Sequence, residues 1–181
     1  AGVKKTLEEL SGKVYGEHQK ETYAFRVVLD HLRAATFLIA DGAVPANKDQ
    51  GYFTRRLIRR AVRYARDLGI HTNFCVAISN AYVEQYTHAY PQLTKEQSRI
   101  QEELAREEEK FRSTLELGLK EFEKLTQGFA VAFEKTGNRI TEISGKQAFK
   151  LYDTFGFPLE MTQELAQEHG LTVDVEGFNA S

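Results

Sequence analysis

The chain has 181 residues, of which 41% are hydrophobic and 28% are charged, and its formal net charge is −2. This length makes one large domain or two small ones with a buried core, and the composition is ordinary for a soluble globular protein. The small net charge conceals an asymmetry, because residues 1–90 carry +4 and residues 91–181 carry −6. A basic region on a nearly neutral chain indicates a localised anionic partner and argues against a protein that coats nucleic acid generally.

Cysteine usage and hydropathy limit the possible compartments and cofactors. The single Cys75 excludes an intramolecular disulfide and a cysteine-based zinc site, and its i,i+4 spacing from His71 is interpreted as ordinary packing. No signal peptide and no membrane-spanning apolar run are present, so we expect a cytoplasmic protein with no membrane partner. Because the chain starts at Ala1 without methionine and ends abruptly at Ser181, we expect a piece of a longer protein.

Helical spacing of apolar residues runs through most of the chain and predicts an all-α fold. We expect a single helical domain over residues 1–181 that consists of a basic helical half (1–92), one long projecting helix (93–136) and a helical subdomain (137–181). The expected helices, in chain order, cover about residues 20–40, an arginine-rich segment closed by Gly69, 72–88, 94–133, 144–155 and 158–170. The strongest strand signal is the short run 139–143.

The arginine-rich helix is the most informative segment. Its six arginines fall within twelve residues and are Arg55, Arg56, Arg59, Arg60, Arg63 and Arg66. At about 100° per residue they share an arc of about 140°, and apolar residues between Leu57 and Leu68 fill the opposite arc. Arginine used without lysine favours forked recognition of phosphate on a solvent-exposed face. The alternative is an arginine face that internal carboxylates neutralise.

A capping-box signal at Thr94 marks the expected start of the long charged helix. A second capping-box signal, at Ser144, marks the start of the helix that follows it. The run from Gln101 to Glu109 is nearly all polar, so we expect that stretch to project from the body. The three glutamates at 107–109 could form a functional acid cluster, but nothing nearby has metal-ligand spacing. We interpret them as a solvated face.

Three blocks resemble alanyl-tRNA synthetases, in the order found in that family. They are DHLRAATFLIADGAVPANKDQGYFTRRLIRRAVRYARDLG at 30–69, EEEKFRSTLELG at 107–118 and GKQAFKLYDTFGFPLEMTQELAQEHGLTVDVEGF at 145–178. The resemblance implies the mostly helical tRNA-recognition domain that lies between the aminoacylation and editing domains. It implies the acceptor stem of tRNA-Ala and the adjoining adenylation and editing domains as partners.

In that family the tRNA is selected by a G·U wobble pair in the acceptor stem. The resemblance places Asn47 and Asp153 at the positions that approach this pair from opposite grooves. From its own chemistry, the arginine row is expected to contact the RNA backbone, with Arg59 and Arg63 preferred. Structural alternatives are that Asn47 stabilises a turn and that Asp153 caps a helix end beside Gly156.

This chain departs from the family pattern at a few loop positions. Ala46 stands where serine is common, Gln50 where arginine is common, and Phe53 and Thr54 replace the usual Val-Leu. These changes bear on individual phosphate contacts at the loop. They do not bear on the wobble readout, because Asn47 and the arginine row are retained.

No glycine-rich phosphate loop, paired metal carboxylates or nucleophile–base arrangement is visible in the sequence. The resemblance implies that ATP and magnesium bind upstream of these residues and that zinc belongs to the editing domain downstream. We therefore expect no catalytic residue, metal or cofactor in this chain, which should bind tRNA without reacting.

Two other classes of protein remain open from the sequence. One is a freestanding helical module that binds DNA or RNA without preference for a wobble pair. The other is a coiled-coil-like interaction protein built on residues 95–133, although Gly118 and Gly128 interrupt its irregular apolar spacing.

Overall fold

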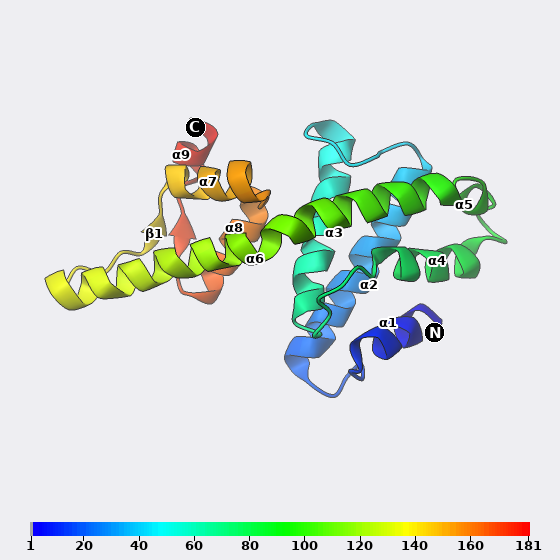
Figure 1. The fold of residues 1–181 in the computed structure, drawn as a ribbon, viewed down its shortest axis with the longest axis horizontal. Helices are drawn as coiled ribbons and strands as arrows, with labels where there is room; N and C mark the ends of the chain where they lie inside the picture. The colour runs from blue at the N-terminus through cyan, green and yellow to red at the C-terminus, as the bar shows by residue number, and fades with distance from the viewer. Residues whose placement is uncertain (1) are drawn as a thin grey trace. The chain divides into compact units, whose positions relative to one another are not determined.

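The structure is a computed structural model that describes residues 2–181, and these residues are mostly helical (Figure 1). The elements in chain order are α1 (Gly2–Ser11), α2 (Gln19–Ala40), α3 (Asp49–Arg66), α4 (Cys75–Tyr86), α5 (Gln92–Lys95), α6 (Gln97–Thr136), β1 (Glu142–Ile143), α7 (Gly145–Phe155), α8 (Leu159–Glu168), β2 (Thr172–Val173) and α9 (Val175–Asn179). The prediction of an all-α fold is confirmed.

The described residues form two compact units, of which the first ends at Lys110 and the second covers Phe111–Ser181. The boundary falls within the helix α6, so the first turns of α6 contribute to one core and its later turns to the other. Each unit buries its own set of apolar side chains.

In the first unit α2 and α3 lie side by side, and α1 lies against α4 (Figure 1). One stripe of α2 is fully buried and includes Phe25, Leu32 and Ile39. A buried hydrogen bond of 2.9 Å joins the hydroxyls of Thr36 on α2 and Ser79 on α4. The helix expected over residues 20–40 is therefore confirmed.

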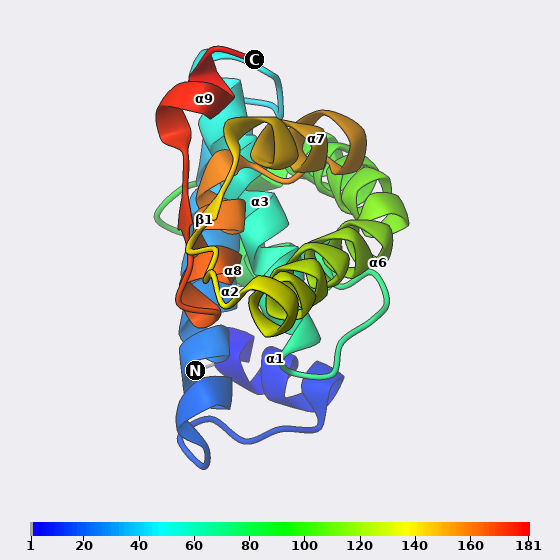
Figure 2. The same cartoon turned by 90° about the vertical axis from the view of Figure 1, so that its left-hand side faces the viewer.

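In the second unit α7 contacts the later part of α6, where Thr114 donates to Phe155 O and Lys150 donates to Glu121. Helix α7 also lies next to α8 and α9 (Figure 2). The rings of Phe111 and Phe157 meet edge to face at 5.9 Å in this core. Strands β1 and β2 form a parallel pair, so the strand signal is confirmed in its last two residues. The capping box at Ser144 is also confirmed, because its hydroxyl accepts from Gln147 N at 3.2 Å and its own N–H donates to the Gln147 side chain at 2.9 Å.

Several expectations for the charged region were wrong. Thr94 lies inside α5, where its hydroxyl bonds to that of Thr87, and it does not cap α6. The stretch Gln101–Glu109 does not project, because Leu104 and two of its glutamates are buried in the first unit. Among the described residues, α6 buries no side chain after Phe122.

The helix expected over residues 72–88 is α4, which begins at Cys75 rather than Thr72.

Two glycines in α6 occupy contrasting environments within the second unit. A Cβ atom added at Gly118 would lie 2.4 Å from the ring of the buried Phe157, whereas a Cβ at Gly128 meets nothing within 4 Å. Gly118 therefore lets an aromatic ring rest directly on the helix backbone, while Gly128 only weakens the helix.

We predict opposite effects of alanine at these two positions. Gly118→Ala should lower the free energy of unfolding by about 1–3 kcal/mol through overpacking. The matched control Gly128→Ala should raise it by about 0.5–1 kcal/mol, because alanine loses less backbone entropy in a helix than glycine. Urea unfolding followed by circular dichroism measures both. Equal stability of the two variants would show that Phe157 does not pack against α6 in this way.

Candidate nucleic-acid interface

Helix α3 has the predicted apolar face, but its arginine face is only partly exposed. The apolar residues Ile58, Val62 and Leu68 are fully buried, as expected. The predicted exposure is wrong for Arg59 and Arg63, which are only 6% and 7% exposed. Arg66 is exposed, and the remaining three arginines are partly exposed.

The burial of Arg59 is explained by Glu107 on α6, which lies in the same unit and is itself buried. Arg59 Nε donates to Glu107 Oε1 at 2.7 Å, and Arg55 Nε donates to the same oxygen at 2.9 Å. Arg55 Nη2 also donates to Glu107 Oε2 at 3.3 Å. One buried carboxylate is therefore shared by two guanidinium groups. The alternative of internal neutralisation holds for these two arginines.

Burial lowers the pKa of Arg59 below its ordinary value, and the charge of Glu107 opposes that change. The opposition matters because an unpaired charge at this depth would be costly. Glu107 thus allows two arginines to sit at the edge of the core of the first unit.

Glu108, the next residue, is also buried and has a different task. Its carboxylate accepts from the backbone N–H of Phe74 at 3.0 and 3.1 Å and from that of Cys75 at 3.0 Å. Phe74 is the N-cap of α4 and has no side chain that can cap, so a carboxylate from α6 satisfies the first N–H groups instead. The interpretation of residues 107–109 as a solvated face is wrong for both Glu107 and Glu108.

We predict that the consecutive glutamates respond differently to loss of charge. Glu107→Gln should lower the free energy of unfolding by about 3–5 kcal/mol, because it leaves a buried guanidinium without its counter-charge. Glu109→Gln is the matched control, since this neighbour is exposed and should change stability by less than about 0.5 kcal/mol. Thermal unfolding monitored by calorimetry distinguishes them. A Glu107→Gln variant as stable as the control would contradict the shared ion pair.

The loop before α3 is held close to the first turn of that helix. Ala46 N donates to Gly51 O at 3.0 Å. A Cβ at Gly51 would lie 2.5 Å from Val44 O and 2.6 Å from Ala46 Cβ, so only glycine permits this approach. Asp49 has φ +55°, a left-handed conformation that aspartate tolerates better than most residues. The loop is therefore a defined support for the residue at its tip.

That residue is Asn47, which is exposed and whose Oδ1 accepts a hydrogen bond from Arg55 Nη1. A guanidinium can only donate, so the amide must turn its oxygen toward Arg55 and keep its NH₂ for another acceptor. No residue between 2 and 181 bonds to this NH₂. The side chain bonds to Arg55 and not to the loop backbone, which disagrees with a role as a turn former.

Asp153 lies in the last turn of α7 in the second unit and is exposed. Across residues 2–181, no group hydrogen-bonds or ion-pairs with its carboxylate. The C-cap is Gly156, with φ 72°, and its backbone N–H bonds to Leu151 O and Tyr152 O. The structural alternative for Asp153 as a helix-end cap is therefore wrong. A carboxylate near a helix C-terminus costs about 0.3–1 kcal/mol against the helix dipole, so helix stability does not explain it.

The structure gives each predicted reader its own unit, Asn47 in the first and Asp153 in the second. Sequence reasoning missed Glu107 as the residue that orients Arg55. The available signal was an acidic residue inside a polar run, and this type of residue is usually solvated.

Neither a metal cluster nor a membrane span is found in the described part of the chain. Within residues 2–181 no three His, Cys, Asp or Glu side chains gather where they could hold a metal ion. Over the same residues, every helix is too short or too polar to cross a bilayer. Cys75 is buried, which agrees with its interpretation as a packing residue.

Comparison with known proteins gives the family. A family model described as tRNA synthetases class II (A) matches residues 1–181, and the chain belongs to this family. A protein from Desulforamulus reducens named alanine–tRNA ligase is 44% identical over 95% of this chain and 19% of its own length. Alanine–tRNA ligases of Borreliella afzelii (44% identity, 97% of this chain, 28% of that protein) and Pelotomaculum thermopropionicum (46%, 93%, 19%) are similarly related.

These matches confirm the resemblance to alanyl-tRNA synthetases that the three sequence blocks indicated. The chain spans between 19% and 28% of the length of these relatives.

Proposed function

We propose that this chain recognises the acceptor stem of tRNA-Ala as part of an alanine–tRNA ligase, with Asn47 and Asp153 reading a G·U wobble pair. The observation that carries the proposal is the exposed carboxylate of Asp153, which no residue in 2–181 satisfies and which its helix does not need. Membership of the tRNA synthetase family supports RNA as the ligand.

The chemistry of a wobble pair suits a carboxylate. Guanine paired with uracil keeps its 2-amino group without its usual partner, and this group lies in the wide minor groove of an RNA helix. Asp153 can accept a hydrogen bond from that amino group, although its charge is repelled by RNA phosphates. Such a residue adds specificity at some cost in electrostatic attraction.

Asn47 suits the other side of the pair because Arg55 already engages its oxygen. The remaining NH₂ can donate to a uracil carbonyl. Arg55 is itself held by the buried Glu107, so the donor is oriented before RNA arrives. This preorganisation lowers the entropy that binding must otherwise remove.

The arginines of the row differ in exposure, and this difference decides which of them we propose to contact the RNA backbone. Arg66 is exposed, and Arg56 and Arg60 are partly exposed, which makes these three better suited to phosphate than the buried Arg59 and Arg63. Arg55 is proposed to act through Asn47. The preference for Arg59 and Arg63 that the sequence suggested is thereby reversed.

The burial of the apolar residues of α6 argues against the coiled-coil alternative. Ile100 and Leu104 are buried in the first unit, and Phe111, Leu115 and Phe122 in the second. A coiled coil needs a continuous apolar seam for its partner helix. The freestanding nucleic-acid module remains the rival, and it differs in having no preference for the wobble pair.

We predict that Asp153→Asn selectively weakens binding to a wobble-containing stem, by about 1–3 kcal/mol, with little effect on a G·C or A·U stem. A purely electrostatic binder would bind every stem as well or better after this change. Fluorescence anisotropy with acceptor-stem hairpins that differ only at the wobble pair makes the measurement. Glu142→Gln, which removes another exposed carboxylate of the same unit, is the control and should preserve the preference. An unchanged preference in Asp153→Asn would remove Asp153 as a reader.

We predict that Arg55→Lys reduces wobble preference as much as Asn47→Ala does, although it keeps the positive charge. Lysine cannot form the fork that bonds Glu107 and Asn47 together. The two changes should be non-additive in the double variant, because they disable one contact. Arg66→Lys, in the same helix but exposed, is the control. Full preference in Arg55→Lys would show that Asn47 needs no orientation by Arg55.

A further inference from the structure

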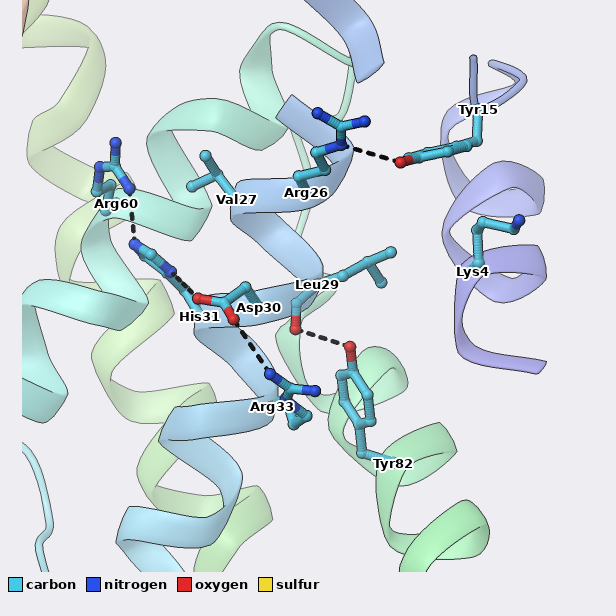
Figure 3. A pocket seen from close by; sticks show the side chains of 10 residues that line it. All are labelled: Lys4, Tyr15, Arg26, Val27, Leu29, Asp30, His31, Arg33, Arg60 and Tyr82. Carbon is cyan, nitrogen blue, oxygen red and sulfur yellow. Dashed lines mark hydrogen bonds and ion pairs between the residues drawn. The ribbon is translucent and has the colours of Figure 1, made fainter. Parts of the chain in front are cut away.

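A basic pocket of about 640 Å³ lies in the first unit, formed by α1, the following loop, α2, α4 and one arginine of α3 (Figure 3). Its charged lining consists of four cationic side chains and a single carboxylate, which are Lys4, Arg26, Arg33, Arg60 and Asp30. The sequence did not indicate this site, because its cations are spread over three helices and none except Arg60 belongs to the arginine row.

Tyr15 holds two of these cations without neutralising them. Arg26 Nε donates to the Tyr15 hydroxyl at 3.0 Å, and Lys4 Nζ lies 5.0 Å from the centre of the Tyr15 ring (Figure 3). The ring is itself fixed edge to face against Phe25 at 5.8 Å. No carboxylate among residues 2–181 pairs with Lys4 or Arg26. Both therefore keep their full charge for a ligand while their positions are restricted.

The single carboxylate, Asp30, serves the other side of the pocket. It accepts from Arg33 Nη2 at 3.2 Å and lies 3.2 Å from His31 Nδ1. Arg60 Nη1 donates to His31 Nε2 at 2.8 Å, which requires a neutral imidazole with its proton on Nδ1, facing Asp30. Asp30 is thus already engaged by two neighbours.

Tyr82 adds no negative charge to the lining. Its hydroxyl donates to Leu29 O at 2.7 Å, and burial raises the pKa of Tyr82 to about 12. The phenol is therefore neutral at physiological pH. The lining therefore carries more cationic groups than carboxylates, and Lys4 and Arg26 are the two that no carboxylate among residues 2–181 pairs with.

We propose that this pocket binds phosphate, and that its ligand is the phosphodiester backbone of RNA. Oriented guanidinium and ammonium groups with neutral holders are suited to phosphate oxygens. The choice of RNA rests on the proposed function of the chain, whereas the phosphate chemistry follows from the lining alone. Free phosphate is the other source of the same chemistry, and the experiment separates the two.

The test measures affinity for an acceptor-stem hairpin by fluorescence anisotropy between about 50 and about 200 mM salt. Arg26→Gln and Lys4→Gln should each reduce the slope of log K against log[salt] by about 1 and weaken binding roughly tenfold at the lower salt. Lys5→Gln is the matched control, because Lys5 is exposed next to Lys4 on α1 but does not line the pocket. It should leave the slope unchanged.

Tyr15→Phe tests whether the site is built or merely charged. It removes the hydroxyl that holds Arg26 and leaves every charge in place, so a general electrostatic attraction predicts no effect. A built site predicts a loss of about two- to tenfold. Circular dichroism melts compare the folding of each variant with that of the parent. Parent-like slopes in both Arg26→Gln and Lys4→Gln, with unaltered melts, would overturn the proposal.

Titration of the RNA-free chain with inorganic phosphate and with AMP distinguishes the two sources. Weak, nonspecific signals together with the slope changes support RNA. Saturable phosphate binding that Arg26→Gln abolishes, without any change in RNA affinity, would overturn the assignment to RNA. Failure here is separable from failure of the wobble readout, because pocket variants should weaken wobble and Watson–Crick stems by the same factor, unlike Asp153→Asn.

Discussion

The ion pairs of the buried Glu107 carboxylate are the interaction on which the arrangement of the first unit depends. It accepts from both Arg55 and Arg59, and so allows two arginines to lie at the edge of an apolar core. Without it, two guanidinium groups at this depth would repel each other, and nothing would compensate for the hydration that burial removes. The interaction also fixes Arg55, whose other nitrogen holds the Asn47 side chain. One buried charge is thus connected to an exposed amide donor.

The two proposed base readers show different relations between structure and function. Asn47 is prepared by its surroundings, through a close loop at Gly51 and an arginine that engages its oxygen. Asp153 is left without a partner among residues 2–181 and opposes the dipole of its own helix. Asn47 is thus oriented by the protein, whereas Asp153 stays in solvent at a position where its charge does not stabilise its own helix.

The distribution of basic side chains explains why counting arginines overestimates the phosphate-binding surface. The arginines of α3 that contact Glu107 form ion pairs that stabilise the fold, and their burial leaves little surface for contact with phosphate. The cations of the pocket around Tyr15 are scattered along the sequence, unlike the arginines of α3. Its Lys4 and Arg26 nevertheless contact the neutral Tyr15 side chain and retain their charge. Affinity for an anion depends on this uncompensated charge, and not on the number of basic residues in a segment.

Sequence alone was enough for the helical class, the periodic core of α2, the Ser144 capping box and the family, because these depend on spacing and motifs within short segments. Through the family resemblance, it also supplied Asn47 and Asp153 as the proposed base readers. Only the tertiary structure decided that Glu107 and Glu108 are buried, that Arg59 is withdrawn from solvent, and that Lys4 and Arg26 meet at Tyr15. The reason is that whether a charged residue is solvated or paired depends on partners distant in the chain, as the 48-residue separation of Arg59 and Glu107 illustrates. Periodicity along one helix carries no information about them.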